Sequence, residues 1–183
     1  MADTKISNLP AASSVAGADL VTIVQSGSNK KATVAQLNAF TGFRAYSGVS
    51  DQSIPGSSTP TKITLDTEEY DTDNTFDSTT NYRHTPTKAG KWLYFGSVRY
   101  QDGVTARLET VMIYKNGNAI AIGQSLTGNQ ISLSRVIPTS VVVNMNGTTD
   151  YIELMAMGSD ATARTVFADA TATYLYGVYL GDS

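Results

Sequence analysis

The chain has 183 residues, of which 41% are hydrophobic, and its formal net charge is −3 at pH 7. This length fits one domain plus a short extra segment, and the apolar content is enough for a core, which excludes wholesale disorder. The acidic balance argues against nucleic-acid binding, which needs dense clusters of Lys and Arg. The chain has no run of 18 apolar residues, which predicts no membrane insertion, and no cysteine, which excludes disulfides and Cys-ligated zinc.

The first part of the chain, residues 1–42, is rich in small and polar residues. Residues 20–24 (LVTIV) predict a strand that ends in a turn-like tract at 25–29. Residues 33–40 predict a brief helix, because a Thr-x-x-Gln capping box begins it and its apolar residues share one face. So few large apolar groups cannot stabilise this part alone, and we expect it to become ordered on a partner surface.

The remaining residues alternate between apolar and polar side chains in short runs. Strands are predicted at 43–46, 91–100, 108–114, 119–126, 131–144, 151–157 and 172–180. Asn116-Gly117 and Asn146-Gly147 are typical of type I′ hairpin turns. Pro138 predicts a bulge or an edge position, and the tract 47–61 predicts a surface loop or strap because it is rich in Ser, Gly and Pro. About eight to ten strands with short connections favour an all-β sandwich or jelly roll.

Residues that could carry chemistry are sparse. His84 is the only histidine, which excludes a site built on a histidine pair, and neither a Gly-x-Ser-x-Gly elbow nor a phosphate-binding loop is present. We therefore expect no enzymatic activity and no cofactor. Six carboxylates within residues 66–77 suit Ca²⁺, but their spacing fails the EF-hand pattern, which favours a solvated acidic loop. The weak metal-ligand candidates are Asp66, Glu68, Asp71 and Asp73.

Several motifs, in order, resemble the complement C1q/tumour-necrosis-factor superfamily. They are an acidic extended run at 61–71, the element TPTKAGKW at 85–92, the hairpin IYKNG at 113–117 and the closing strand YLYGVYL at 174–180. The resemblance covers roughly residues 43–182 and implies a jelly-roll domain that forms a homotrimer through its first and last strands. The resulting trimer-interface candidates are Phe43, Tyr174, Tyr176 and Tyr179. Aromatic side chains of this kind can also fill the sandwich of the monomer itself, and alternation alone does not decide between the two roles.

The N-terminal segment is similar to the attachment module at the start of many tailed-bacteriophage fibres and head fibres. The similarity rests on KISNLPAA at 5–12, GADLVTIVQ at 17–25 and KATVAQL at 31–37. It implies two parts, a virion-attachment segment at 1–42 and a jelly-roll knob at 43–183. The virion-anchoring candidates are Ile6, Leu9, Leu20, Ile23, Val34 and Leu37.

Together, the two resemblances imply a non-enzymatic bacteriophage virion protein, a short trimeric head fibre or capsid decoration knob. The implied partners are further copies of the chain, the major capsid protein or another virion protein, and a glycan or protein on the host surface. The implied location is the virion, assembled in the host cytoplasm. The alternative is the receptor-binding tip of a tail fibre or tailspike. A depolymerase is disfavoured, because glycoside hydrolysis normally needs two carboxylates held across a cleft.

Overall fold

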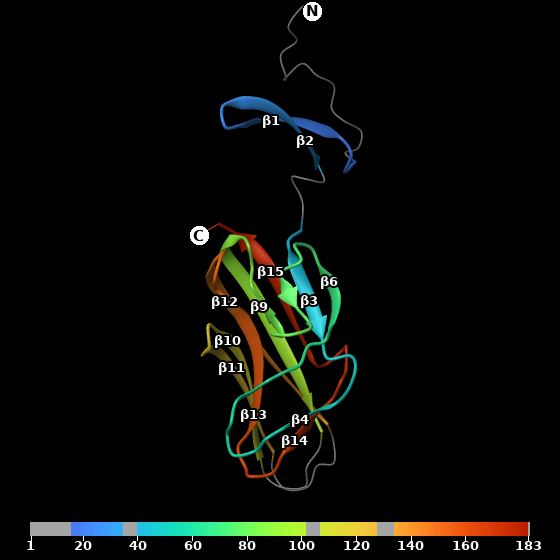
Figure 1. Ribbon diagram of the computed structural model, residues 1–183, viewed down its shortest axis with the longest axis vertical. Coiled ribbons are helices and arrows are strands. Elements are labelled where there is room, and N and C mark those ends of the chain that lie inside the picture. The colour runs from blue at the N-terminus through green and yellow to red at the C-terminus, as the bar shows by residue number, and fades with distance from the viewer. Residues whose placement is uncertain (1–15, 35–39, 102–106, 128–133, 183) are drawn as a thin grey trace, which may run out of the picture. The chain divides into compact units, whose positions relative to one another are not determined.

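The computed structural model describes residues 16–34, 40–101, 107–127 and 134–182 (Figure 1). The chain forms two compact units, Met1–Phe40 and Thr41–Ser183. Within the described ranges, no helix is long and apolar enough to cross a membrane.

The first unit contains an antiparallel hairpin of β1 (Leu20–Gln25) and β2 (Ser28–Thr33). Its two-residue turn has positive φ at Ser26 (52°) and Gly27 (74°), the backbone that lets a two-residue loop follow the twist of the strands. The strand predicted at 20–24 is therefore confirmed. The predicted turn tract was too long, since its last two residues already belong to β2. The helix predicted at 33–40 lies largely outside the described residues, and Thr33 is the last residue of β2.

The second unit is a jelly roll of two antiparallel sheets (Figure 1). The seven-stranded sheet contains β3 (Gly42–Tyr46), β4 (Gln52–Ile54), β6 (Thr67–Asp71), β9 (Ala89–Tyr100), β12 (Arg135–Asn146), β14 (Arg164–Val166) and β15 (Tyr174–Gly181). The six-stranded sheet contains β5 (Thr61–Lys62), β7 (Phe76–Asp77), β8 (Arg83–His84), β10 (Arg107–Lys115), β11 (Asn118–Thr127) and β13 (Ile152–Gly158). The predicted all-β jelly-roll fold is confirmed. Eight of these described strands have five or more residues, and the others are too short to leave a periodic signal in the sequence.

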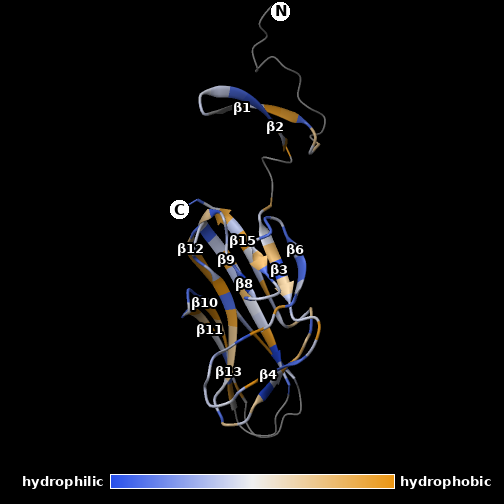
Figure 2. Ribbon diagram, viewed as in Figure 1, coloured by the Kyte–Doolittle hydropathy of each residue, from blue (hydrophilic) through white to orange (hydrophobic). Residues whose placement is uncertain are grey.

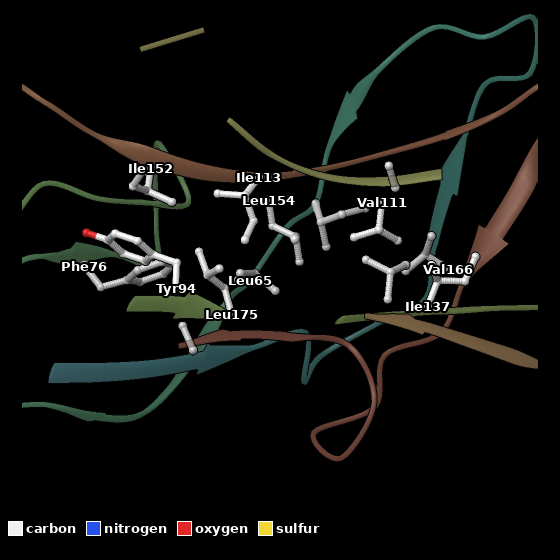
Figure 3. Packing of buried hydrophobic residues seen from close by; sticks show 14 of the residues in the cluster. Leu65, Phe76, Tyr94, Val111, Ile113, Ile137, Ile152, Leu154, Val166 and Leu175 are labelled. Carbon is white, nitrogen blue, oxygen red and sulfur yellow. The ribbon is translucent and has the colours of Figure 1, made fainter. Parts of the chain in front are cut away.

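The hydrophobic core lies between the two sheets (Figure 3). In β9 the inward side chains Trp92, Tyr94 and Val98 are buried, because every second residue of a strand points to the same face. Figure 2 shows the matching alternation of hydropathy along the strands. Gly177 of β15 is opposite this row, and a Cβ on it would lie 2.7 Å from ring atoms of both Phe43 and Tyr94. A glycine is required here so that the large rings can pack against the strand.

The two Asn-Gly pairs differ in structure. Asn116 (φ 52°) and Gly117 (φ 79°) close the β10–β11 hairpin, which confirms the predicted type I′ turn. The hairpin expected at Asn146-Gly147 is wrong, because β12 pairs with β9 and β13 pairs with β10, so this turn connects the two sheets. The Asn146 side chain shapes it by accepting three backbone N–H bonds from Thr148, Thr149 and Asp150.

Pro138 lies in an edge strand. β12 pairs with β9 along its whole length without a register shift, so the edge position is confirmed and no bulge is present at the proline. The other side of β12 approaches β11 so closely that a Cβ on Gly123 would lie 2.2 Å from the Pro138 carbonyl oxygen. The tract 47–61 is a strap, since Ile54 of β4 is fully buried and β4 pairs with β14.

Candidate interaction surface

The outer face of the seven-stranded sheet carries three stacked aromatic rings. Tyr174 and Tyr176 of β15 point away from the core, and Tyr176 is directly opposite Phe95 of β9. The ring centroids are 5.5 Å apart for Phe95 and Tyr176, 6.0 Å for Phe95 and Tyr174, and 6.3 Å for the two tyrosines. Offset stacking of this kind stabilises a flat aromatic surface whose faces are partly exposed to solvent.

Aliphatic side chains extend this surface. Leu93 of β9 is opposite Val178 of β15 on one side and Val142 of β12 on the other, and Val142 is 55% exposed. We define the outer apolar face as Leu93, Phe95, Val142, Tyr174, Tyr176 and Val178. Contiguous apolar surface of this kind is typical of a protein interaction site.

Arginines border the outer apolar face. The Arg44 guanidinium lies 4.7 Å from the centroid of Tyr174 and pairs with Glu69. Arg99 pairs with Asp169 at 2.7 Å and lies over the ring of Phe167 at 5.0 Å. Both cations therefore have partners within the same chain.

A second exposed apolar group lies on β11. Ile122 and Leu126 are 60% and 76% exposed, respectively, on the outer face of the six-stranded sheet. Ile122 is directly opposite Met112 of β10, which is itself buried, so the exposed group is confined to β11. The jelly roll thus carries exposed apolar groups on both sheets.

The four predicted interface residues divide into three groups. Tyr174 and Tyr176 lie together on the outer apolar face. Tyr179 points to the opposite side of β15, where it contacts Trp92 at 5.4 Å and its hydroxyl donates to the Ala89 carbonyl oxygen at 3.2 Å. The assignment of Phe43 to an interface is wrong, because β3 turns its side chain fully into the core.

Phe95, Leu93 and Val142 were not identified from the sequence as interface residues. A signal was present, since the run at 91–100 has large apolar residues on both of its faces. In an antiparallel sheet one face is usually solvated and polar, so apolar residues on both faces of a strand mark it as a candidate for contact on its outer face.

The acidic candidates at 66–77 are each used locally. Asp66 accepts the N–H groups of Gly48 and Val49, and Glu68 accepts the Ser78 hydroxyl at 2.6 Å. In the part of the chain that the structure describes, no group of three or more His, Cys, Asp or Glu side chains could hold a metal ion. The other two candidates behave in the same way: Asp71 accepts the backbone N–H groups of Thr75 and Phe76, and Asp73 pairs with Lys88 at 3.4 Å. The structure therefore does not bring the weak metal candidates together as one ligand set.

His84 is a buried core residue. Its Nε2 is hydrogen bonded to the Thr75 hydroxyl and its Nδ1 to the Tyr94 hydroxyl, both at 2.9 Å. Burial lowers the pKa of His84 to about 3. A ring with such a pKa is a weak base, so the pairing with a threonine hydroxyl does not make an activated nucleophile.

Three of the anchoring candidates lie on or near the N-terminal hairpin. Leu20 is 61% exposed and Ile23 is half-buried. Val34 is half-buried, and its backbone N–H donates to the Asp19 carbonyl oxygen at 2.9 Å. Ile6, Leu9 and Leu37 lie outside the described residues.

Comparison with known proteins identifies solved structures that share this fold. No protein-family description matches the sequence, and no curated protein matches it. Among solved structures, the chain is similar to Eiger TNF from S. frugiperda, with a TM-score of 0.61 and 8% identity over 79% of this chain and 94% of that one. It is also similar to murine APRIL (TM-score 0.57, 12% identity, 77% and 99% covered) and to the globular domain of the zebrafish complement 1qA protein (0.54, 10%, 79% and 99%). These likenesses establish a fold shared with TNF and C1q domains.

Proposed function

We propose that this protein is a non-enzymatic bacteriophage virion protein, a short trimeric head fibre or capsid decoration knob. In this proposal, residues 1–42 attach it to the major capsid protein or another virion protein, and residues 43–183 form the knob. The observation that carries the proposal is the outer apolar face, on a jelly roll whose described residues include no evident catalytic or metal-binding group.

Self-association follows from the two apolar surfaces. A contact between the outer apolar face of one copy and the β11 side chains Ile122 and Leu126 of the next is heterologous, and such contacts form a ring when the rotation between copies closes. Buried tyrosines suit this role, because each ring contributes a large apolar area and keeps its hydroxyl available for a polar partner. The resemblance to the C1q/tumour-necrosis-factor superfamily selects a ring of three.

Attachment through the N-terminal segment is supported by its small size. A single two-stranded hairpin is at best marginally stable in water, and this one exposes Leu20 and Val21. A virion surface that covers these side chains supplies the missing burial. The resemblance of this segment to phage attachment modules points to the same role.

The two ends of the knob then have different roles. The Tyr179 N–H donates to the Thr41 carbonyl oxygen at 3.0 Å, so the last strand runs beside the first residue of the jelly-roll unit, close to where the attachment segment joins the knob. The opposite end contains the end of β9 at Tyr100 and the start of β12 at Arg135, which are paired. We assign this far end to contact with a host-surface glycan or protein. The same feature favours the second candidate, the receptor-binding tip of a tail fibre or tailspike.

Immunogold labelling of intact virions tests the proposal and separates the two candidates. An antibody against the knob is expected to label the head of the particle. Label confined to the tail tip would favour the receptor-binding alternative, and particles without label would contradict a virion role altogether.

A further inference from the structure

The single histidine is enclosed by aromatic rings at a junction of short elements. The His84 ring stacks on Phe43 with a centroid distance of 4.2 Å, and lies 4.9 Å from Trp92 and 5.7 Å from Tyr94. It is 1% exposed. It is thus in contact with strands β3 and β9 at once, although it belongs to the two-residue strand β8.

The segment around His84, residues 72–85, joins the rest of the jelly roll through short strand pairs and separate side-chain contacts. β8 pairs with β13 through two residue pairs, and β7 pairs with β8 through two more. Phe76 and His84 are its two large buried side chains. The Lys62 ammonium adds a hydrogen bond to the Asn81 carbonyl oxygen at 3.1 Å. At its edges, the Thr72 N–H donates to the Gly42 carbonyl oxygen, Asp73 pairs with Lys88, and Ser78 donates to Glu68. Because its strand pairs are short and most of these side-chain contacts are near the surface, we expect the segment to open at lower free energy than the core strands.

The hydrogen bonds of the ring suit only its neutral form. A neutral imidazole has one donor and one acceptor nitrogen, so one of the Thr75 and Tyr94 hydroxyls donates to it and the other accepts from it. Protonation makes both nitrogens donors. The hydroxyl that had donated then has to turn, and its proton is left without an acceptor in a buried site, which is costly.

The carboxylates near the site are bonded to groups other than the His84 ring. The Asp71 carboxylate accepts the Thr75 and Phe76 N–H groups, at 2.5 Å and 2.6 Å, and does not reach the ring. From the β12–β13 turn, Asp150 acts on the Tyr94 phenol, and that carboxylate pairs with Lys115 at 2.8 Å.

Further titratable groups near the ring are Arg83, Tyr94 and, on β13, Glu153, which is opposite Arg83 and pairs with Lys62 at 2.5 Å. Arg83, the neighbour of His84 in β8, lies over the Tyr151 ring at 4.4 Å. Burial raises the pKa of Tyr94, which stays neutral. The imidazolium would therefore be enclosed by Phe43 and Trp92 without a carboxylate bound to it.

We propose that His84 is an acid-operated latch, whose protonation releases residues 72–85 from the jelly roll while the two sheets stay folded. When the segment is closed, the ring is neutral and joins the segment to β3 and β9. When it is open, the ring is solvated and takes up a proton. Acid therefore favours the open state.

The size of the effect follows from linkage. In the closed state the pKa of His84 is about 3, and in the open state it returns to its ordinary value of 6.5. Because the pKa is lowered on closing, the latch is fully effective above pH 6.5 and weakens as the pH falls toward 3. Between pH 7 and pH 5 the opening constant is expected to rise by about 25-fold.

Hydrogen exchange on the intact chain tests this. The Thr72 amide is bonded to the Gly42 carbonyl oxygen of β3 at 3.1 Å, and this bond is lost when the segment leaves the jelly roll. After correction for intrinsic rates, this amide is expected to lose protection by about that factor between pH 7 and pH 5, whereas β9 and β10 amides keep theirs. In His84→Gln, which carries hydrogen-bonding groups but does not titrate, the change is expected to vanish. An equal acid response in that variant, or a parallel loss of protection in β9 and β10, would overturn the proposal.

A second measurement needs no variant. The chain has one histidine and one tryptophan, so the histidine ring signal in proton NMR and the Trp92 fluorescence each report on a single site. The ring signal of the folded protein is expected to stay in its neutral position down to pH 5. Titration of the folded protein near pH 6.5 would show that the ring is accessible and that no latch exists.

Discussion

At the residue scale, a buried carboxylate between two arginines is an unexpected feature of the core. Glu109 of β10 is fully buried, and the Arg135 guanidinium donates to both of its oxygens, at 2.9 Å and 3.0 Å. Arg164, also buried, approaches it to 3.6 Å and pairs with Asp160 as well. The group joins β10, β12 and β14 across the two sheets.

Removal of this charge is expected to destabilise the domain strongly. Glu109→Gln would leave the Arg135 guanidinium without its carboxylate and would remove one of the two carboxylates beside the buried Arg164. We therefore expect a loss of about 3–5 kcal/mol of unfolding free energy in urea titrations. Lys88→Ala is the control, because its ion pair with Asp73 is largely solvated and is expected to contribute less than about 1 kcal/mol. Similar losses in the two variants would show that Glu109 has no special role.

A second residue-scale prediction concerns the glycine beneath the core rings. Gly177→Ala would place a methyl group against Phe43 and Tyr94, and overpacking of this kind costs about 1–3 kcal/mol. Thermal unfolding is expected to show a lowered midpoint. The exposed Ser140→Ala on β12 should leave the midpoint nearly unchanged, and an unaltered midpoint in Gly177→Ala would mean that the rings can move aside.

Parity along a strand could have revealed part of this chemistry from the sequence. Glu109 has the same parity as Val111 and Ile113, so alternation alone places a charge on the core face of that strand. Its partners Arg135 and Arg164 could not be deduced, because they come from strands whose pairing depends on the whole topology. His84 is visible in the sequence only as a lone histidine, and its aromatic cage could not be deduced because it depends on the positions of β3 and β9.

At the scale of elements, β9 and β15 place the outer apolar face in the middle of a sheet. Tyr174 and Tyr176 were identified from the closing strand, since alternation sorts its residues into two faces. Phe43 and Tyr179 were not separated from them, because a sequence does not say which face of a strand is the core. The failed hairpin at Asn146-Gly147 has a similar cause, since a turn motif does not tell whether the next strand joins the same sheet.

The outer apolar face is expected to be needed for assembly and not for folding. Tyr176→Glu places a charge beside Phe95, where a neighbouring copy would desolvate it, and should convert assembled protein to folded monomer in gel filtration. Val49→Glu, at an apolar residue that is already 78% exposed and belongs to neither apolar surface, is the control and should leave the assembly intact. Assembly that survives Tyr176→Glu would place the interface elsewhere.

At the scale of the whole molecule, the division into a hairpin-containing unit and a jelly roll predicts independent roles. Deletion of residues 1–40 should leave a folded jelly roll that assembles as the full chain does, because its core is formed by residues 41–183. The shortened protein is expected to lose its attachment to virions, measured by sedimentation of particles with added protein. Undiminished binding would move the anchor into the knob.

The central claim is that three copies of this chain assemble through the outer apolar face. Static light scattering of the full chain at micromolar concentration measures the assembly directly. The expected result is a mass near three times the 19.5 kDa of one chain. A stable mass equal to one chain, with the jelly roll folded, would contradict the claim.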